Sequence, residues 1–70
     1  MNLDLDIAVL NSLISINYSG KITNSIIYNN VGQKILSSKE KIISITKIPT
    51  GLYFILIETV DGTCTKKFIK

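Results

Sequence analysis

The chain lacks histidine, arginine and tryptophan, and it has one cysteine and one proline among its 70 residues. Without histidine, and with Cys64 as the single thiol, neither a Cys/His zinc site nor an intrachain disulfide can form. The carboxylates are Asp4, Asp6, Glu40, Glu58 and Asp61. None of them forms a convincing acid–base pair, so we expect no enzyme, no metal site and no cofactor.

The positive charge of the chain comes from lysine alone, and the formal net charge is +3. Proteins that read nucleic acids usually employ arginine forks and exposed aromatic rings, whereas these lysines are scattered along the chain. We therefore expect a solvated lysine surface and no nucleic-acid partner.

The sequence also lacks an uncharged apolar run of the roughly 18 residues that a membrane-spanning helix needs. Its composition, 46% hydrophobic and 19% charged, favours one compact soluble domain with no membrane insertion. The front of the chain is acidic where a secretory signal peptide would be basic. We therefore expect no export signal there, so that the domain is either cytoplasmic or one piece of a longer polypeptide.

Alternation of apolar and polar residues with a period of two dominates the chain, and no window has a helical stripe. Strands are expected at residues 3 to 10, 13 to 17, 22 to 29, 33 to 37, 42 to 46, 51 to 60 and 63 to 69. About seven short strands separated by turn signals predict an all-β fold, an antiparallel β-sandwich. A small five-stranded barrel is the competing architecture.

Three turn signals connect the later strands. The stretch from Asn29 to Gly32 suits a type I turn closed by a glycine bulge. Pro49 and Gly51 suit a turn that enters a strand. Asp61-Gly62 predicts a two-residue hairpin loop in which Val60 faces Thr63.

That hairpin register places Ile55 opposite Phe68 and Phe54 opposite Ile69. It also sets Glu58 diagonal to Lys67, and it sets Lys66 beside Ile57 on the apolar face. Lys66 then either extends its ammonium group to the rim or is shifted outward by a bulge.

The aromatic residues Tyr28, Tyr53 and Phe68 are expected in the core. In the longest strand, Leu52, Phe54 and Leu56 form a second apolar face. In a two-layer sandwich this second face would meet solvent, so it suggests contact with a partner or with a preceding domain.

The spacing of several short motifs resembles the C-terminal sorting domain, type A, of the type IX secretion system of Bacteroidota. The matching segments run in order from residue 13 to residue 70. They are Ile27-Tyr28-Asn29, Gly32-Gln33, Ile43-Ser44-Ile45, the segment from Pro49 through Gly51 and Tyr53 to Ile55, Gly62-Thr63, and Lys66-Lys67-Phe68.

The resemblance implies an immunoglobulin-like β-sandwich at residues 13 to 70, preceded by an atypical strand at residues 1 to 12. It implies a secretion signal that directs an N-terminally fused cargo through the periplasm to the surface or the medium. The partners implied are the type IX translocon and a sortase-like protease. Lys66, Lys67, Phe68 and Lys70 correspond to the terminal segment expected to matter for recognition.

Two other interpretations remain open. One is a fibronectin-like or adhesin-like module that binds protein or carbohydrate, which would need an exposed aromatic platform. The other is a packing domain with no recognition role. The sequence leaves the oligomeric state open.

Overall fold

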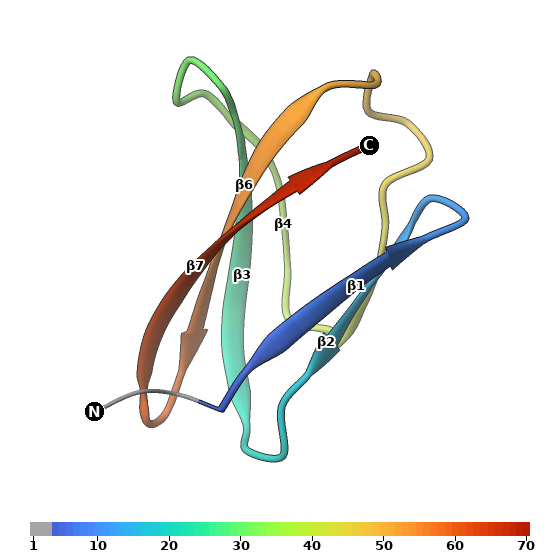
Figure 1. Cartoon of the computed structure of the whole chain (residues 1–70). Coiled ribbons are helices and arrows are strands. Elements are labelled where there is room, and N and C mark those ends of the chain that lie inside the picture. Colours follow the sequence, from blue (N-terminus) through green and yellow to red (C-terminus); the bar gives the residue numbers. More distant parts are fainter. Residues whose placement is uncertain (1–3) are drawn as a thin grey trace.

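Seven antiparallel strands in two sheets make up the computed structural model, which describes residues 4–70 (Figure 1). The strands are β1 (Asp6–Leu10), β2 (Leu13–Asn17), β3 (Ile22–Asn29), β4 (Lys34–Ser38), β5 (Ile42–Ser44), β6 (Leu52–Thr59) and β7 (Gly62–Ile69). One sheet has the order β1-β2-β5 and the other has the order β4-β3-β6-β7. The predicted all-β, immunoglobulin-like sandwich is confirmed.

The expected strands agree with the observed ones to within two residues at most ends, and β1 begins at Asp6. Residues 1 to 3, where the first strand was expected to start, lie outside the described part of the chain. β1 and β2 pair along their whole length from Asp6–Asn17 to Leu10–Leu13. The turn between them consists of Asn11 and Ser12 with φ of 53° and 61°, the left-handed pair that a type I′ hairpin requires.

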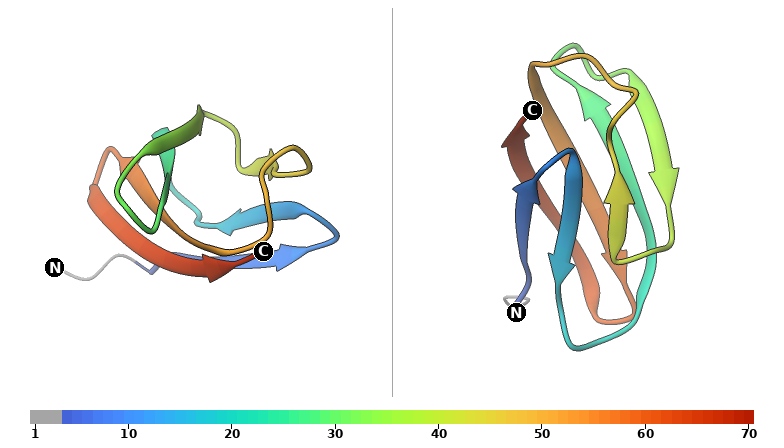
Figure 2. Two further views of the ribbon diagram at one scale, coloured as in Figure 1. Left: turned by 90° about the horizontal axis from the view of Figure 1, so that it is seen from above. Right: turned by 90° about the vertical axis from the view of Figure 1, so that its right-hand side faces the viewer.

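Aliphatic side chains from both sheets fill the space between them. The completely buried ones are Ile14, Ile27, Ile45, Ile55 and Ile57. Both sheets twist, and β1 of one sheet lies beside β7 of the other (Figure 2). Because each strand contributes alternate residues to this core, the remaining residues of every strand form two outward faces.

The β6–β7 hairpin differs from the predicted register. Its loop is Val60-Asp61, because Thr59 pairs with Gly62. The Thr59 hydroxyl closes this turn: it accepts a hydrogen bond from the Asp61 amide at 3.0 Å and donates one to the Gly62 carbonyl at 2.9 Å. Consequently Tyr53, not Ile55, faces Phe68, and their rings stack with centroids 5.6 Å apart.

Three further expectations change with this register. Phe54 pairs with Lys67 instead of Ile69, and Glu58 pairs with Thr63, so Glu58 is not diagonal to Lys67. Lys66 pairs with Ile55 in a ladder without a bulge, and it is half-buried on the core face. The alternative in which a bulge shifts Lys66 outward is therefore wrong.

Tyr28 was expected in the core, and this expectation is wrong. Its neighbour Ile27 points inward and is completely buried, so Tyr28 points to the outer face of the four-stranded sheet, where it is half-buried. The sequence of β3 does not show by itself which of its two faces is buried, because Ser25 occupies a core position and the apolar Ile26 does not. Tyr53 and Phe68, each 5% exposed, are core residues as expected.

Candidate functional site at the C-terminal strand

The final strand, β7, forms one edge of the four-stranded sheet and carries the residues expected to matter for recognition (Figure 1). Its side chains alternate between the core and the outer face. Phe68 is buried against Tyr53, and Lys66 is half-buried on the same side. Lys67 and Ile69 point outward, and Ile69 is 73% exposed.

Backbone pairing continues past β7 to Lys70. The Lys70 amide donates to the Gly51 carbonyl at 2.9 Å, and the Gly51 amide donates to the Lys70 carbonyl at 3.2 Å. Gly51 has φ of +152° and lies exposed at the start of β6. The C-terminal residue is thus held in the sheet by two main-chain hydrogen bonds.

Two side chains also donate hydrogen bonds to backbone carbonyls in this region. The Lys70 ammonium group donates to the Thr46 carbonyl at 3.1 Å and also to the Ile48 carbonyl. The Tyr53 hydroxyl donates to the Pro49 carbonyl at 2.6 Å. The Lys70 bonds tie the β5–β6 connection to the end of the last strand, and the Tyr53 bond ties the same connection to β6.

The four predicted recognition residues therefore have different surroundings. Lys67 is free to meet a partner, whereas Phe68 is part of the core and the Lys70 ammonium group already has carbonyl acceptors. Lys66 lies between these cases, since it is half-buried on the core face. The structure brings Lys70, Pro49, Gly51, Tyr53 and Phe68 together at one end of the molecule.

The remaining motif residues form turns. Gly32, with φ of +85°, ends the β3–β4 hairpin, where its amide donates to the Asn29 carbonyl at 3.1 Å. The Asn29 side chain accepts from the Gln33 amide and donates to the Gln33 side chain, both at 2.9 Å. Gly62 follows the β6–β7 loop. These contacts give Gly32, Gln33 and Gly62 structural roles.

Carboxylate side chains lie toward one end of the sandwich, together with Lys21, Lys39 and Lys41. The carboxylates Asp4, Asp6, Glu40, Glu58 and Asp61 all lie toward the end with the β2–β3 and β6–β7 connections. The opposite end, which holds the C-terminus, carries Lys34, Lys47, Lys67 and Lys70 and no carboxylate side chain. This end therefore has a positive potential that would attract an acidic partner.

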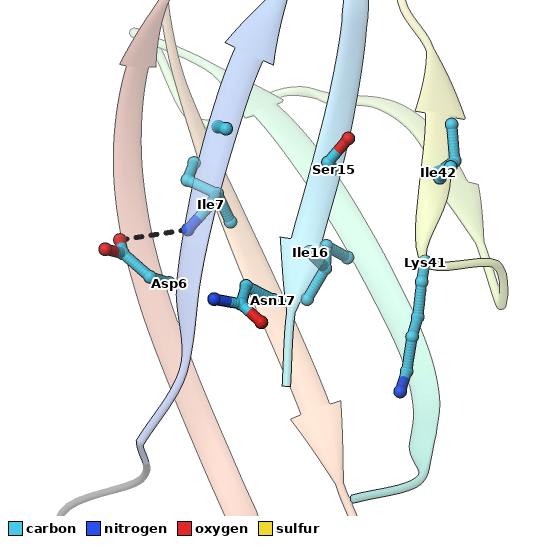
Figure 3. Close-up of a pocket in the computed structure, with 8 residues that line it drawn as sticks. Asp6, Ile7, Ser15, Ile16, Asn17, Lys41 and Ile42 are labelled. Carbon is cyan, nitrogen blue, oxygen red and sulfur yellow. Dashed lines mark hydrogen bonds between the residues drawn. The ribbon is translucent and has the colours of Figure 1, made fainter. Parts of the chain in front are cut away.

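A shallow pocket of about 420 Å³ lies at the three-stranded sheet, where Asp6, Ser15, Asn17 and Lys41 supply its polar groups (Figure 3). Two of these groups are already hydrogen bonded. Asp6 Oδ1 accepts from the Ile7 amide at 2.9 Å, and the Lys41 ammonium group donates to the Tyr18 carbonyl at 2.6 Å. The pocket has no arrangement of nucleophile and base that would support a reaction.

Among residues 4–70 no group of three or more Asp, Glu, Cys or His side chains is placed to hold a metal ion. Within the same residues no helix has the length and apolar character needed to cross a membrane.

The domain is thus a two-sheet β-sandwich whose last strand is anchored at its end. A family model described as the secretion system C-terminal sorting domain matches residues 10–70. The chain therefore belongs to this family, which confirms the resemblance to type IX sorting domains. Neither the comparison with curated proteins nor the comparison with solved structures gives a match.

Members of this family are sorting signals and not enzymes, and each is the C-terminal tail of an exported cargo. Membership indicates a type IX sorting signal and export of the carrier protein to the cell surface or the medium.

Proposed function

We propose that this domain directs a protein fused to its N-terminus across the outer membrane by the type IX secretion system. The proposed route passes through the periplasm to the translocon. A sortase-like protease then removes the domain, and the cargo is anchored at the surface. The family match over residues 10–70 is the observation that carries this proposal.

The structure supports a recognition signal that is read in its folded state. Recognition of this kind needs a stable edge and an accessible terminal segment, not reactive groups. β7 provides the edge, and Lys67 with Ile69 provides exposed side chains close to the terminus. We propose that Lys67 contacts the translocon directly, while Phe68 and Lys70 position the strand.

An export assay tests this function. The chain is fused behind a signal peptide and a fluorescent protein in a bacterium with a type IX system, and surface and medium fluorescence are measured. We expect delivery in this strain and retention in the periplasm of a strain that lacks the translocon. Equal delivery in both strains, or retention of a correctly folded fusion in both, would contradict the proposal.

Deleting residues 66–70 is a poor test of recognition, because it also removes Phe68 from the core, which costs about 3 to 5 kcal/mol. Lys67→Glu is sharper, since its side chain is exposed. We expect reduced delivery with an unchanged melting temperature. Lys21→Glu, an exposed lysine at the opposite end, is the matched control and should be delivered normally.

The second interpretation, a binding module of the fibronectin or adhesin type, needs an exposed aromatic platform. Tyr28 and Phe54 pair on the outer face of the four-stranded sheet and are half-buried there. This pair is the observation that favours a binding role.

A further inference from the structure

The outer face of the four-stranded sheet carries an apolar stripe that no other part of residues 4–70 covers. It comprises Ile26 and Tyr28 on β3 and Leu52, Phe54 and Leu56 on β6. β3 and β6 are the two central strands of this sheet, so the stripe runs along its middle. Such a stripe on a small domain indicates a contact surface.

Lysines bound the stripe on both sides in a single cross-strand row. Lys67 pairs with Phe54, Phe54 pairs with Tyr28, and Tyr28 pairs with Lys34. Directly paired residues point to the same face, so all four side chains lie on the outer surface. In the next row, Thr65 and Ser37 flank Leu56 and Ile26, so these two rows have polar edges on both sides. In the row of Leu52 the β7 edge carries the exposed Ile69.

The spacing of this row suits one α-helix. Four adjacent strands are separated by three intervals of about 4.8 Å, which puts the Lys34 and Lys67 backbones roughly 14 Å apart. An α-helix with its side chains is about 10 to 12 Å in diameter. A helix laid along the stripe would therefore fit between the lysines, with its own flanking residues beside their ammonium groups.

We propose that this face binds an amphipathic α-helix of a partner protein, whose apolar side covers the stripe and whose flanking carboxylates pair with Lys34 and Lys67. Charge argues for this occupant. Both bounding lysines are positive, and the carboxylate of this face, Glu58, lies farther along β6 toward the acidic end. A second copy of the chain would bring the same positive row to the contact, which is less favourable than an acidic helix.

The proposal is independent of the export assay, because binding is measured on the purified chain. The probe is a synthetic helix of about 18 residues, with leucines along one side, glutamates flanking them and alanines elsewhere. Backbone amide chemical shifts are recorded during titration. We expect saturable shifts at residues of β3, β6 and β7 that face outward, such as Ile26, Thr65 and Lys67.

Charge reversal supplies the decisive comparison. The double variant Lys34→Glu/Lys67→Glu should bind the probe about tenfold more weakly. The control Lys21→Glu/Lys39→Glu makes the same change in net charge with two exposed lysines at the opposite end, and its affinity should stay within about twofold of the parent. Circular dichroism melting confirms that both variants are folded.

Several results would overturn the proposal. They are an absence of binding, equal binding of a probe with lysines in place of the glutamates, and shifts centred on the β1-β2-β5 sheet. Binding to phosphatidylglycerol vesicles without binding to the probe would assign the face to a membrane surface instead. Concentration-dependent shifts on this face in the absence of probe would assign it to self-association.

Discussion

Ser25 occupies a core position on β3 and is completely buried, yet its hydroxyl has no hydrogen-bond partner among residues 4–70. A buried polar group without a partner costs about 1 to 3 kcal/mol, because it has lost its bonds to water. Its nearest cross-strand neighbours are Ser38 and Ile57. The position is therefore a source of instability in a small core.

Replacing this hydroxyl by hydrogen should stabilise the domain. We expect Ser25→Ala to raise the free energy of unfolding by about 1 kcal/mol, measured by urea denaturation, since the unpaired group disappears and little volume is lost. Ser15→Ala, on an exposed position of β2, is the control and should change little. A loss of stability in Ser25→Ala would show that the hydroxyl makes a favourable contact.

Tyr18 links the β2–β3 connection to the β6–β7 hairpin, because its hydroxyl donates a hydrogen bond to Asp61. The ring also lies over Gly20, where an added Cβ would come within 2.6 Å of it. The hydrogen bond to the Asp61 carboxylate raises the pKa of Tyr18 above its usual value of about 10, since ionisation would break the bond.

This shift predicts an alkaline loss of stability. The neutral hydroxyl is favoured in the folded state, so its contribution is complete below pH of about 10 and is lost as the pH rises through the folded-state pKa. We expect thermal melting between neutral pH and pH of about 11 to show a steeper decline in the parent than in Tyr18→Phe. Parallel declines would mean that the link does not form in solution.

At the level of strands, the β3–β4 hairpin is the local structure that the chain encodes most directly. Asn29 organises the turn through its side chain, and Gly32 ends it in the left-handed region. A Cβ added to Gly32 would meet nothing within 4 Å, so the backbone conformation alone requires glycine.

The stability lost on substituting Gly32 should therefore depend on how well the new residue adopts positive φ and not on the size of its side chain. We expect Gly32→Ala to lower the free energy of unfolding by about 1 kcal/mol, and Gly32→Asn by less, because asparagine tolerates positive φ better. Chemical denaturation measures both values. If alanine and asparagine cost the same, the turn must rearrange when glycine is lost.

The β6–β7 hairpin shows why strand positions were easier to predict than strand partners. The observed register differs from the expected one by two residues, because the loop moves from Asp61-Gly62 to Val60-Asp61. A shift of two keeps every side chain on its original face, so the hydrophobic pattern is satisfied equally well by both registers. The Thr59 hydroxyl and the stacking of Tyr53 on Phe68 favour the observed one.

For the complete sandwich, small size makes each core contact important. A domain of 70 residues has a stability of roughly 4 to 10 kcal/mol. Ile55 is completely buried at the centre of β6, and its truncation to alanine costs about 2 to 5 kcal/mol. One such substitution therefore removes a large part of the free energy of unfolding of the domain.

We expect Ile55→Ala to show no cooperative melting transition, or to melt at a much lower temperature than the parent, as followed by circular dichroism. Ile69→Ala, at a position 73% exposed on β7, is the matched control and should melt almost normally. Equal melting temperatures for the two variants would contradict the assignment of the core.

Strand positions and turns follow from short-range properties of the chain. Alternation of apolar residues places each strand, and Asn29, Gly32, Pro49 and Gly51 mark turns, because backbone preferences act within a few residues. The inward direction of Ile43, Ile45, Tyr53 and Phe68 could be read in the same way. The motif order also carried the family assignment, which needs no coordinates.

Contacts between distant residues were decided by packing of the two sheets. The row of Lys67, Phe54, Tyr28 and Lys34 joins residues from four strands, and the Lys70 ammonium group reaches carbonyls more than twenty positions earlier. No local pattern specifies such pairs, because registers that differ by two residues bury the same faces. Complementary packing of the assembled sheets selects one register, and with it the composition of the outer surface.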